Sequence, residues 1–349
     1  MSQRVDPVDA IADAVLYEGY ILYPYRPSAI KNRVRWTFGG IFPRPYSEAL
    51  SGGEPWLMQT QCLLQADASC RLQVQVRFLH LVDRRVARLV EPGLEGAYEV
   101  VESLEVDGRV LSSWQEAVER RLSLDELALA DLWSGSRRVP VDLPAETSRE
   151  PIRDAEGRTV AVIIRKSEAI EGAVEVAAER VAMGTTRLTV RITNTTALPD
   201  RGSVRREEAA MRALVSTHTV LRAAGGGFIS LADPPEDLRE VAAACHNVGA
   251  WPVLVGPEGA TDTMLSSPII LEDHPQVAAE SPGDLFDATE IDEILTLRIL
   301  ALTEEEKAEM RRADERGRLL LERTERLGEE QLMRLHGRFR QLPTGEDRP

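Results

Sequence analysis

The sequence predicts an α+β fold with two β-rich, antiparallel units followed by a C-terminal group of short helices. Strand-like runs cluster without long helices between them, which disfavours a parallel sheet built from strand–helix–strand units. Prolines and polar residues concentrate at 134–157, between two such clusters. From residue 284 the apolar spacing changes to a helical period. The 349 residues also exceed the roughly 250–300 residues that one hydrophobic core usually supports.

These observations give five predicted parts of the chain. The first β-rich domain covers 1–133, and 134–157 is a linker or a long exposed connection. The second β-rich domain covers 158–283. The C-terminal helices cover 284–342, and 343–349 is a disordered tail.

The first domain begins with a predicted helix at 7–17, because Pro7 is tolerated in a first helical turn. Apolar and polar residues then alternate along 72–78, which predicts a half-buried strand with Arg77 on its polar face. Residues 56–64 are expected to pair with this strand across the polar turn at 66–69.

Tyr98–Val106 reads as a further strand that ends at the Asp107-Gly108 turn. Residues 114–122 fit either a helix or a strand. In the second domain, Gly225–Gly227 favours a hairpin turn, with an anion-binding nest as the alternative. Strands are also predicted at 159–165, 174–181, 188–193, 213–222, 228–231, 251–255 and 264–271, and a short helix at 235–245.

The predicted C-terminal helices start at Asp287, which with Glu290 has the spacing of a capping box. Their apolar anchors would be Ile291, Ile294, Leu295, Leu332, Leu335 and Phe339.

Composition excludes several classes of protein. With 42 Lys plus Arg against 57 Asp plus Glu, the net charge of −15 argues against a surface that coats nucleic acid or anionic membranes. No apolar run approaches the roughly 18–20 residues of a membrane span. The acidic, amphipathic N-terminus does not resemble a signal peptide, and Cys62, Cys70 and Cys245 form no disulfide framework. We therefore expect a cytoplasmic protein with reduced thiols and no cofactor.

Residues 19–46, the basic aromatic segment, reverse the charge of the chain locally. They hold five basic residues, no acidic residue and seven aromatic residues, a composition typical of interaction hot spots. The alternative is that Val34, Trp36 and Phe38 are core residues and the arginines between them are solvated. Single-stranded nucleic acid would use the same residue types, but the acidity of the chain argues against it. The candidate partner-binding residues are Tyr23, Tyr25, Arg26, Lys31, Arg33 and Arg35.

Familiar catalytic motifs are missing: no phosphate-binding loop, dinucleotide fingerprint, zinc-protease motif or nucleophile elbow occurs. Cys245-His246 is the one Cys–His adjacency, and adjacent helical residues diverge by about 100°, so we expect no metal there unless the helix ends at that point. Asp273-His274 fits half of an acid–base pair or an Asx-type turn before proline, and we favour the turn.

Two blocks, AVLYEGYILYPYRPSAIKNRVRWTFG at 14–39 and residues 251–312, resemble a family of uncharacterised accessory proteins. These are encoded beside the oxygen-tolerant, high-affinity [NiFe]-hydrogenase of actinobacteria and some other soil bacteria. The resemblance spans most of the chain and implies a role in maturation, assembly or support of the hydrogenase. It does not imply a hydrogenase subunit, because large subunits bind nickel and iron through two CxxC pairs and small subunits bind clusters through many cysteines.

The sequence thus leaves three hypotheses for function. The first is a non-catalytic accessory or interaction protein whose partners are hydrogenase subunits or other proteins of the same gene cluster. The second is a structural scaffold protein. The third is an enzyme of unrecognised type, hydrolase-like or a metal-dependent maturation factor, using Cys245, His246, His218 or His274.

Overall fold

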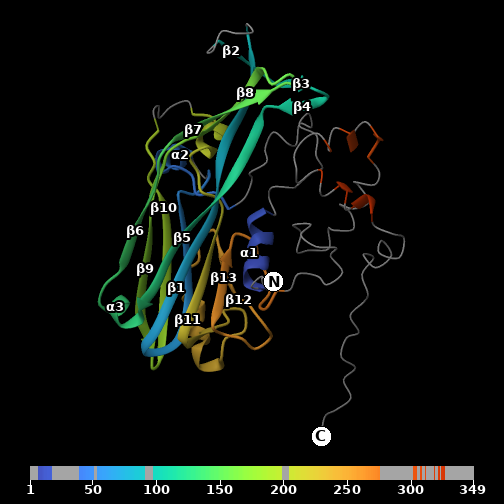
Figure 1. Ribbon diagram of the computed structural model, residues 1–349. Helices are drawn as coiled ribbons and strands as arrows, with labels where there is room; N and C mark the ends of the chain where they lie inside the picture. Colours follow the sequence, from blue (N-terminus) through green and yellow to red (C-terminus); the bar gives the residue numbers. More distant parts are fainter. Residues whose placement is uncertain are drawn as a thin grey trace.

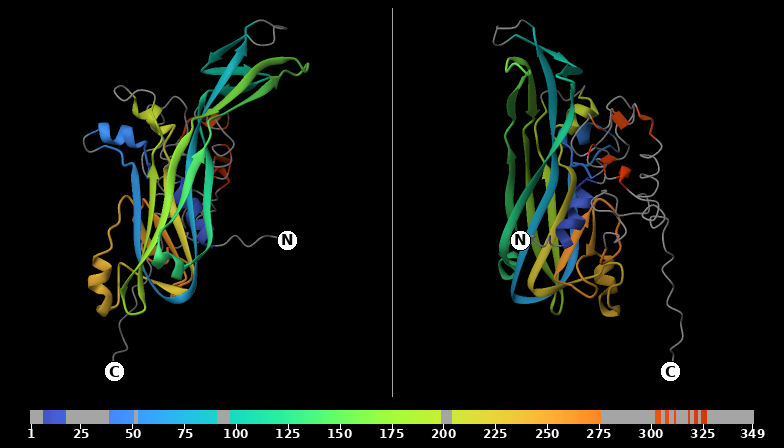
Figure 2. Two further views of the ribbon diagram at one scale, coloured as in Figure 1. Left: turned by 90° about the vertical axis from the view of Figure 1, so that its left-hand side faces the viewer. Right: turned by 45° about the vertical axis from the view of Figure 1, so that its right-hand side comes forward.

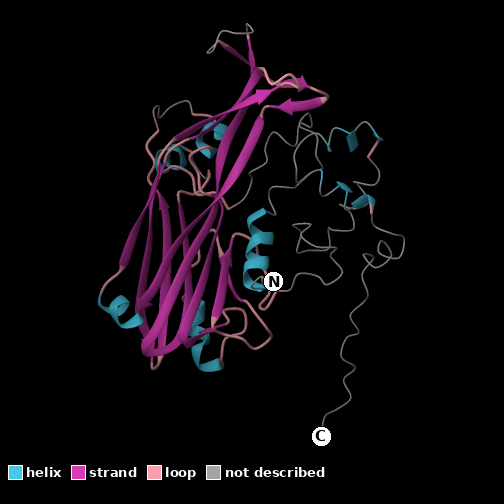
Figure 3. Cartoon of the chain, viewed as in Figure 1, coloured by secondary structure: helices cyan, strands magenta, loops and turns pink. Residues whose placement is uncertain are grey.

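The computed structural model describes residues 7–17, 39–50, 53–90, 97–198 and 204–275, with some positions between 302 and 326. The described residues are mostly β, with 55% strand and 17% helix, and their strands form one antiparallel sheet of 11 strands plus a small hairpin (Figures 1 and 3).

The predicted α+β class, with two β-rich units and a C-terminal helix group, is therefore wrong. Strands from both predicted β-rich units pair in the same sheet: β1 (Leu57–Leu89) pairs with β5 (Trp114–Ala128) and also with β10 (Thr185–Asn194). Local alternation identifies strands but carries no information on which distant strand each one meets, so it could not show that the two clusters share a sheet.

Strand β1 is 33 residues long and bends over at the lower end of the molecule (Figure 2). Leu63–Ala66 pair with the end of β11 (Val215–Ile229), and Arg71–Leu79 pair with its beginning, with a register shift between these stretches. The two arms of β1 therefore do not pair with each other as a hairpin, and the prediction that they do is wrong. They lie in opposite layers of a sandwich, where alternate residues of each arm point into the shared core.

Three glycines let β11 bend beside β1. Gly225 has a φ of +85°, and a Cβ on Gly226 would lie 2.8 Å from the Cβ of Ala66. The predicted hairpin turn at Gly225–Gly227 is thus wrong, because these residues lie inside one continuous strand.

One layer consists of the first arm of β1 with β10, β9 (Ile170–Ala182) and β6 (Arg137–Leu143). The other consists of the second arm with β5, β11, β13 (Thr263–Ser267) and β12 (Trp251–Leu254). The core between them takes Leu72, Val74, Val76 and Phe78 from β1, Leu188, Val190 and Ile192 from β10, and Val174 and Val176 from β9.

The upper end of β1 carries a narrow extension of the sheet (Figure 1). Here β1 pairs with β2 (Tyr98–Val101) and β8 (Thr159–Ser167), and β7 (Glu146–Arg153) pairs with β8. Strands β6 and β7 lie within 134–157, and their mostly exposed positions explain the polar composition of that range.

A hairpin of β3 (Ser103–Val106) and β4 (Arg109–Ser112) also belongs to this extension. Its turn residues Asp107 and Gly108 have φ values of 49° and 74°, which confirms the predicted turn and is typical of a type I′ hairpin.

Short helices cover the sandwich. Helix α1 (Pro7–Tyr17) confirms the predicted N-terminal helix, and α3 (Leu129–Ser134) connects β5 in one layer to β6 in the other, burying Leu129 and Leu132.

Among the described residues no helix is long and apolar enough to cross a membrane. Most of the predicted C-terminal helical region, 284–342, lies outside the described residues. The other described helices are α2 (Arg44–Ala49), α4 (Arg206–Ala210), η3 (Glu236–Leu238) and α5 (Arg239–Ala243).

Candidate functional site: the N-terminal helix over a buried charge cluster

Helix α1 packs on the outer face of the second layer. Its buried residues Val8, Ile11 and Ala12 pack in one apolar cluster with Val220 of β11 and Leu265 of β13. Positions 8, 11 and 12 are spaced as one face of a helix, so the amphipathic pattern directs this face onto the sheet.

Arg77 of β1 lies at the centre of the surface beneath α1. Its side chain is 0% exposed and makes ion pairs with Asp13 of α1 and with Glu119 of β5. Arg77 Nε and Nη2 lie 2.8 and 2.7 Å from Glu119 Oε1, and Arg121 Nε donates to the same oxygen at 2.5 Å. Burial raises the pKa of Glu119, but the hydrogen bonds and charges of the two arginines lower it below its usual value.

His218 lies directly opposite Arg77 in the pairing of β1 with β11. It is fully buried, and its pKa is lowered to about 3, first by burial and then by the positive charge of Arg77. Its Nδ1 donates to the carbonyl oxygen of Ser216 at 3.1 Å, which fits a neutral ring protonated on Nδ1. His218 Nε2 and Arg77 Nη1 are buried and have no hydrogen-bond partner among the described residues.

The cluster can hold the N-terminal helix on the sheet. Two arginines and two carboxylates balance in charge, and Asp13, whose side chain is 46% exposed, connects α1 to a cation that water cannot reach. A buried guanidinium is stable only when it is paired and hydrogen-bonded. Arg77 therefore favours the docked position of α1.

A second stretch of the N-terminal part, Gly39–Phe42, is also attached to the sheet. Ile41 exchanges two backbone hydrogen bonds with Leu214, at 2.8 and 3.1 Å, and Gly39 accepts one from Thr217 at 3.0 Å. The buried amide of Asn194 donates to the Ile41 carbonyl at 2.9 Å. This stretch is thus fixed at the beginning of β11, in the same layer that α1 covers.

The described end of the basic aromatic segment serves the fold. Phe42 is 1% exposed and stacks on Tyr46 with ring centroids 5.7 Å apart. Arg44 lies 4.5 Å above the ring of Trp56 and pairs with Glu48. The predicted partner-binding residues lie outside the described residues and stay a prediction: Tyr23, Tyr25, Arg26, Lys31, Arg33 and Arg35.

The Cys245-His246 pair follows α5. Cys245 Sγ lies 3.8 Å from the Val241 carbonyl oxygen, and burial raises the pKa of its thiol, so the reactive thiolate is disfavoured. His246 is exposed, and its backbone N–H and carbonyl bond to Gln61 Oε1 at 2.8 Å and to Gln59 Nε2 at 2.9 Å. The two glutamines of β1 thus fix the end of this helix on the sheet.

The Asp273-His274 pair is also used by the fold. Asp273 Oδ1 accepts from the Leu254 N–H at 2.7 Å, and its Oδ2 accepts from the Ser230 hydroxyl at 2.5 Å. His274 has a φ of 54° and donates its backbone N–H to the Leu254 carbonyl at 2.7 Å. The Asp273 carboxylate therefore connects β12 and β11 to the loop that follows β13.

The four candidate catalytic residues do not come together. His218 lies opposite Arg77 on β11, Cys245 and His246 lie at the end of α5, and His274 lies beside β12. Across the described ranges, no three His, Cys, Asp or Glu side chains are arranged to hold a metal ion.

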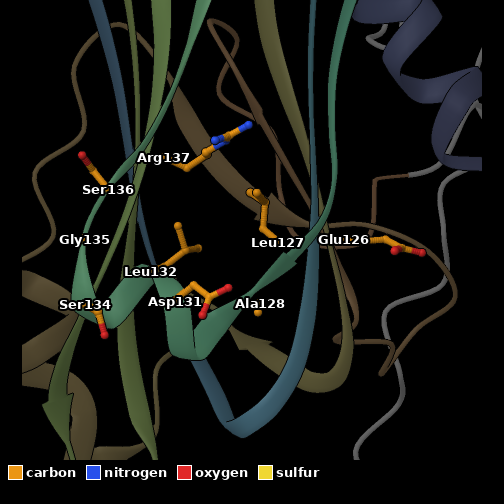
Figure 4. A pocket seen from close by; sticks show the side chains of 9 residues that line it. All are labelled: Glu126, Leu127, Ala128, Asp131, Leu132, Ser134, Gly135, Ser136 and Arg137. Carbon is orange, nitrogen blue, oxygen red and sulfur yellow. The ribbon is translucent and has the colours of Figure 1, made fainter.

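A shallow hollow of about 590 Å³ lies between the end of β5, helix α3 and the start of β6. Figure 4 shows Arg137 and Leu127 directed into the space between the two strands, whereas Glu126 and Ser134 point away from it. Its lining is mixed apolar and charged, without a group of convergent polar side chains.

Sequence reasoning missed the central residue of the cluster. Arg77 alternates with apolar neighbours and so was expected on a solvated face, but α1 packs over its end of that face and buries it. The sequence did contain one signal for this burial. In the predicted helix at 7–17, Asp13 lies beside the apolar residues that face the sheet.

Comparison with known proteins adds no relative. No family model matches the chain, and no curated protein matches it either.

Proposed function

We propose that this chain is a non-catalytic interaction protein that supports maturation or assembly of a [NiFe]-hydrogenase. Its partners are hydrogenase subunits or other proteins of the same gene cluster. The resemblance of residues 14–39 and 251–312 to accessory proteins of such clusters supports the class of partner, and the placement of the N-terminal attachments supports where the partner binds.

The observation that carries the proposal is that the described residues on both sides of 18–38 attach to one layer of the sandwich. The preceding helix α1 is held by Asp13 on buried Arg77, and the following residue, Gly39, is bonded to Thr217. A segment closed at both ends has less conformational entropy to lose when a partner orders it. The attachments on both sides of the most basic and aromatic part of the chain therefore favour binding of a partner there.

The charge of the basic aromatic segment supports a role in recognition. The chain carries a net charge of −15, but the basic aromatic segment contains no acidic residue. An acidic partner surface would be repelled by most of the molecule and attracted here, which favours one orientation of encounter. Arginine and tyrosine are also the residues that contribute most per contact at protein interfaces.

The test is a binding assay with the double variant Arg26→Ala/Arg33→Ala against hydrogenase-cluster proteins. Each substitution should cost about 1–2 kcal/mol of binding free energy and leave the melting temperature unchanged. The matched control is Arg158→Ala/Arg205→Ala, because these arginines are 73% and 74% exposed in other parts of the surface. Unchanged binding with a lowered melting temperature would show that Arg26 and Arg33 serve the fold instead.

A further inference from the structure

Strand β5 has a long open edge. It is 15 residues long and pairs with β1 on one side, and no other described strand pairs with it. An open edge presents unpaired backbone N–H and C=O groups that can accept another strand. β5 therefore offers a backbone surface for strand addition.

The other edges of the described sheet are shorter or blocked. Strands β6, β7 and β12 each have one partner strand, and each contains a proline: Pro140, Pro151 and Pro252. Proline lacks the N–H donor and hinders further pairing. β2 has only four residues, whereas β5 contains no proline, so β5 is the described edge best suited to pairing.

The side chains of β5 have an order that suits self-pairing. Val118 is 43% exposed although it is a large apolar residue. Glu116 and Arg120 lie two residues to either side of it, on the same face of the strand, with side chains 23% and 31% exposed. Glu116 also pairs with Arg84 and Arg165 of its own chain. Arg120 Nε is buried without a hydrogen-bond partner among the described residues, and the carboxylate paired with this guanidinium, Glu146, is 3.8 Å away.

We propose that β5 pairs antiparallel with β5 of a second copy of this chain, about a two-fold axis at Val118. Such an axis runs perpendicular to the sheet, so residues equally far from it face each other on one side of the sheet. Val118 then meets Val118 of the second copy, and Glu116 meets the second copy's Arg120, twice by symmetry.

The order of charges favours this register over three neighbouring ones. An axis at Glu119 places two glutamates face to face, and an axis at Arg120 or Arg121 does the same with two arginines, which is repulsive. Charges on an edge strand usually prevent pairing, but in the Val118 register the facing charges, Glu116 and Arg120, are opposite. The two copies form one continuous sheet through their second layers.

A cysteine at the axis tests the pairing directly. Opposite Cα atoms in an antiparallel pair lie about 4.5–5.5 Å apart, within the roughly 4.4–6.8 Å that a disulfide spans. In a Cys245→Ser background, which removes the one half-buried thiol, Val118→Cys should oxidise to a covalent dimer. Val100→Cys, on β2 and 55% exposed, is the control and should stay monomeric. Equal cross-linking of both variants, or none at Val118→Cys, would overturn the proposal.

A charge reversal tests the register without a cross-link. Sedimentation equilibrium over a concentration series should show a reversible dimer for the unmodified protein. Arg120→Glu, which faces Glu116 of the second copy, should raise the dissociation constant roughly a hundredfold or more, whereas Arg138→Glu on β6 should leave it unchanged. Melting curves confirm that both variants fold. A monomer at every concentration, or an unchanged dimer in Arg120→Glu, would contradict self-pairing.

Discussion

Acidification should destabilise this protein through His218. The ring is fully buried and its pKa is lowered to about 3, against 6.5 for an exposed histidine. Below pH 6.5 the unfolded chain binds a proton that the folded chain excludes, so the stabilisation is complete above this pH and is lost as the pH falls towards about 3. At about pH 5 the difference of about 1.5 pH units corresponds to roughly 2 kcal/mol of unfolding free energy.

The variant His218→Asn isolates this effect, because asparagine Nδ2 can donate to the Ser216 carbonyl in place of the ring Nδ1 and does not titrate. Urea unfolding at about pH 7.5 and about pH 5 should show that the unmodified protein loses roughly 2 kcal/mol more than the variant. Burial also lowers the pKa of His80, but that contribution is common to both proteins. His246→Asn, at an exposed histidine, is the control and should behave as the unmodified protein. Equal losses in the unmodified protein and His218→Asn would refute the burial of a neutral ring beside Arg77.

Two further substitutions test the cluster and the sheet. Glu119→Gln leaves the guanidinium of Arg77 with less compensating charge and should cost about 3 kcal/mol of unfolding free energy; because the Glu119 pKa is lowered, this cost should shrink as the pH falls below 4.5. Asp13→Asn should cost only about 1 kcal/mol, since this carboxylate is half-exposed, and should increase hydrogen exchange in α1; no change in exchange would remove Asp13 from the docking of the helix. Gly172→Ala should cost about 3 kcal/mol or more, because its Cβ would overlap a backbone oxygen of β10, whereas Gly135→Ala has open space and should be neutral in the same denaturation assay.

The parts of the fold that depend on neighbouring residues could be predicted from the sequence. The alternation along Leu72–Phe78 gives the strand, and Asp107-Gly108 gives the type I′ turn, because both signals act within a few residues. The pairing of β1 with β11 could not be predicted in this way, since Arg77 and His218 are far apart in the chain. The bend of β1 was missed because a polar turn between two apolar runs is equally typical of a hairpin.

For the candidate site, too, the sequence indicated what neighbouring residues determine and missed what distant contacts determine. The sequence singled out Cys245 and His246 as chemically unusual neighbours, but in the structure the Cys245 thiol bonds to the Val241 carbonyl and the His246 backbone fixes the end of α5 on β1. The sequence analysis placed Arg77 on a solvated face. Alternation predicts which face of a strand a residue occupies, but not whether another element, here α1, covers that face. Helix α1, whose Asp13 is 64 residues from Arg77 in the chain, converts an ordinary polar position into the most buried charge of the described residues.

Co-purification tests the proposed function most directly. The tagged full-length chain is purified from cells that express the complete hydrogenase gene cluster, and the bound proteins are identified by mass spectrometry. The proposal predicts a hydrogenase subunit or another protein of that cluster in stoichiometric amount, lost in Arg26→Ala/Arg33→Ala and retained in Arg158→Ala/Arg205→Ala. Recovery of the chain free of every protein of the cluster would contradict an accessory role in hydrogenase assembly.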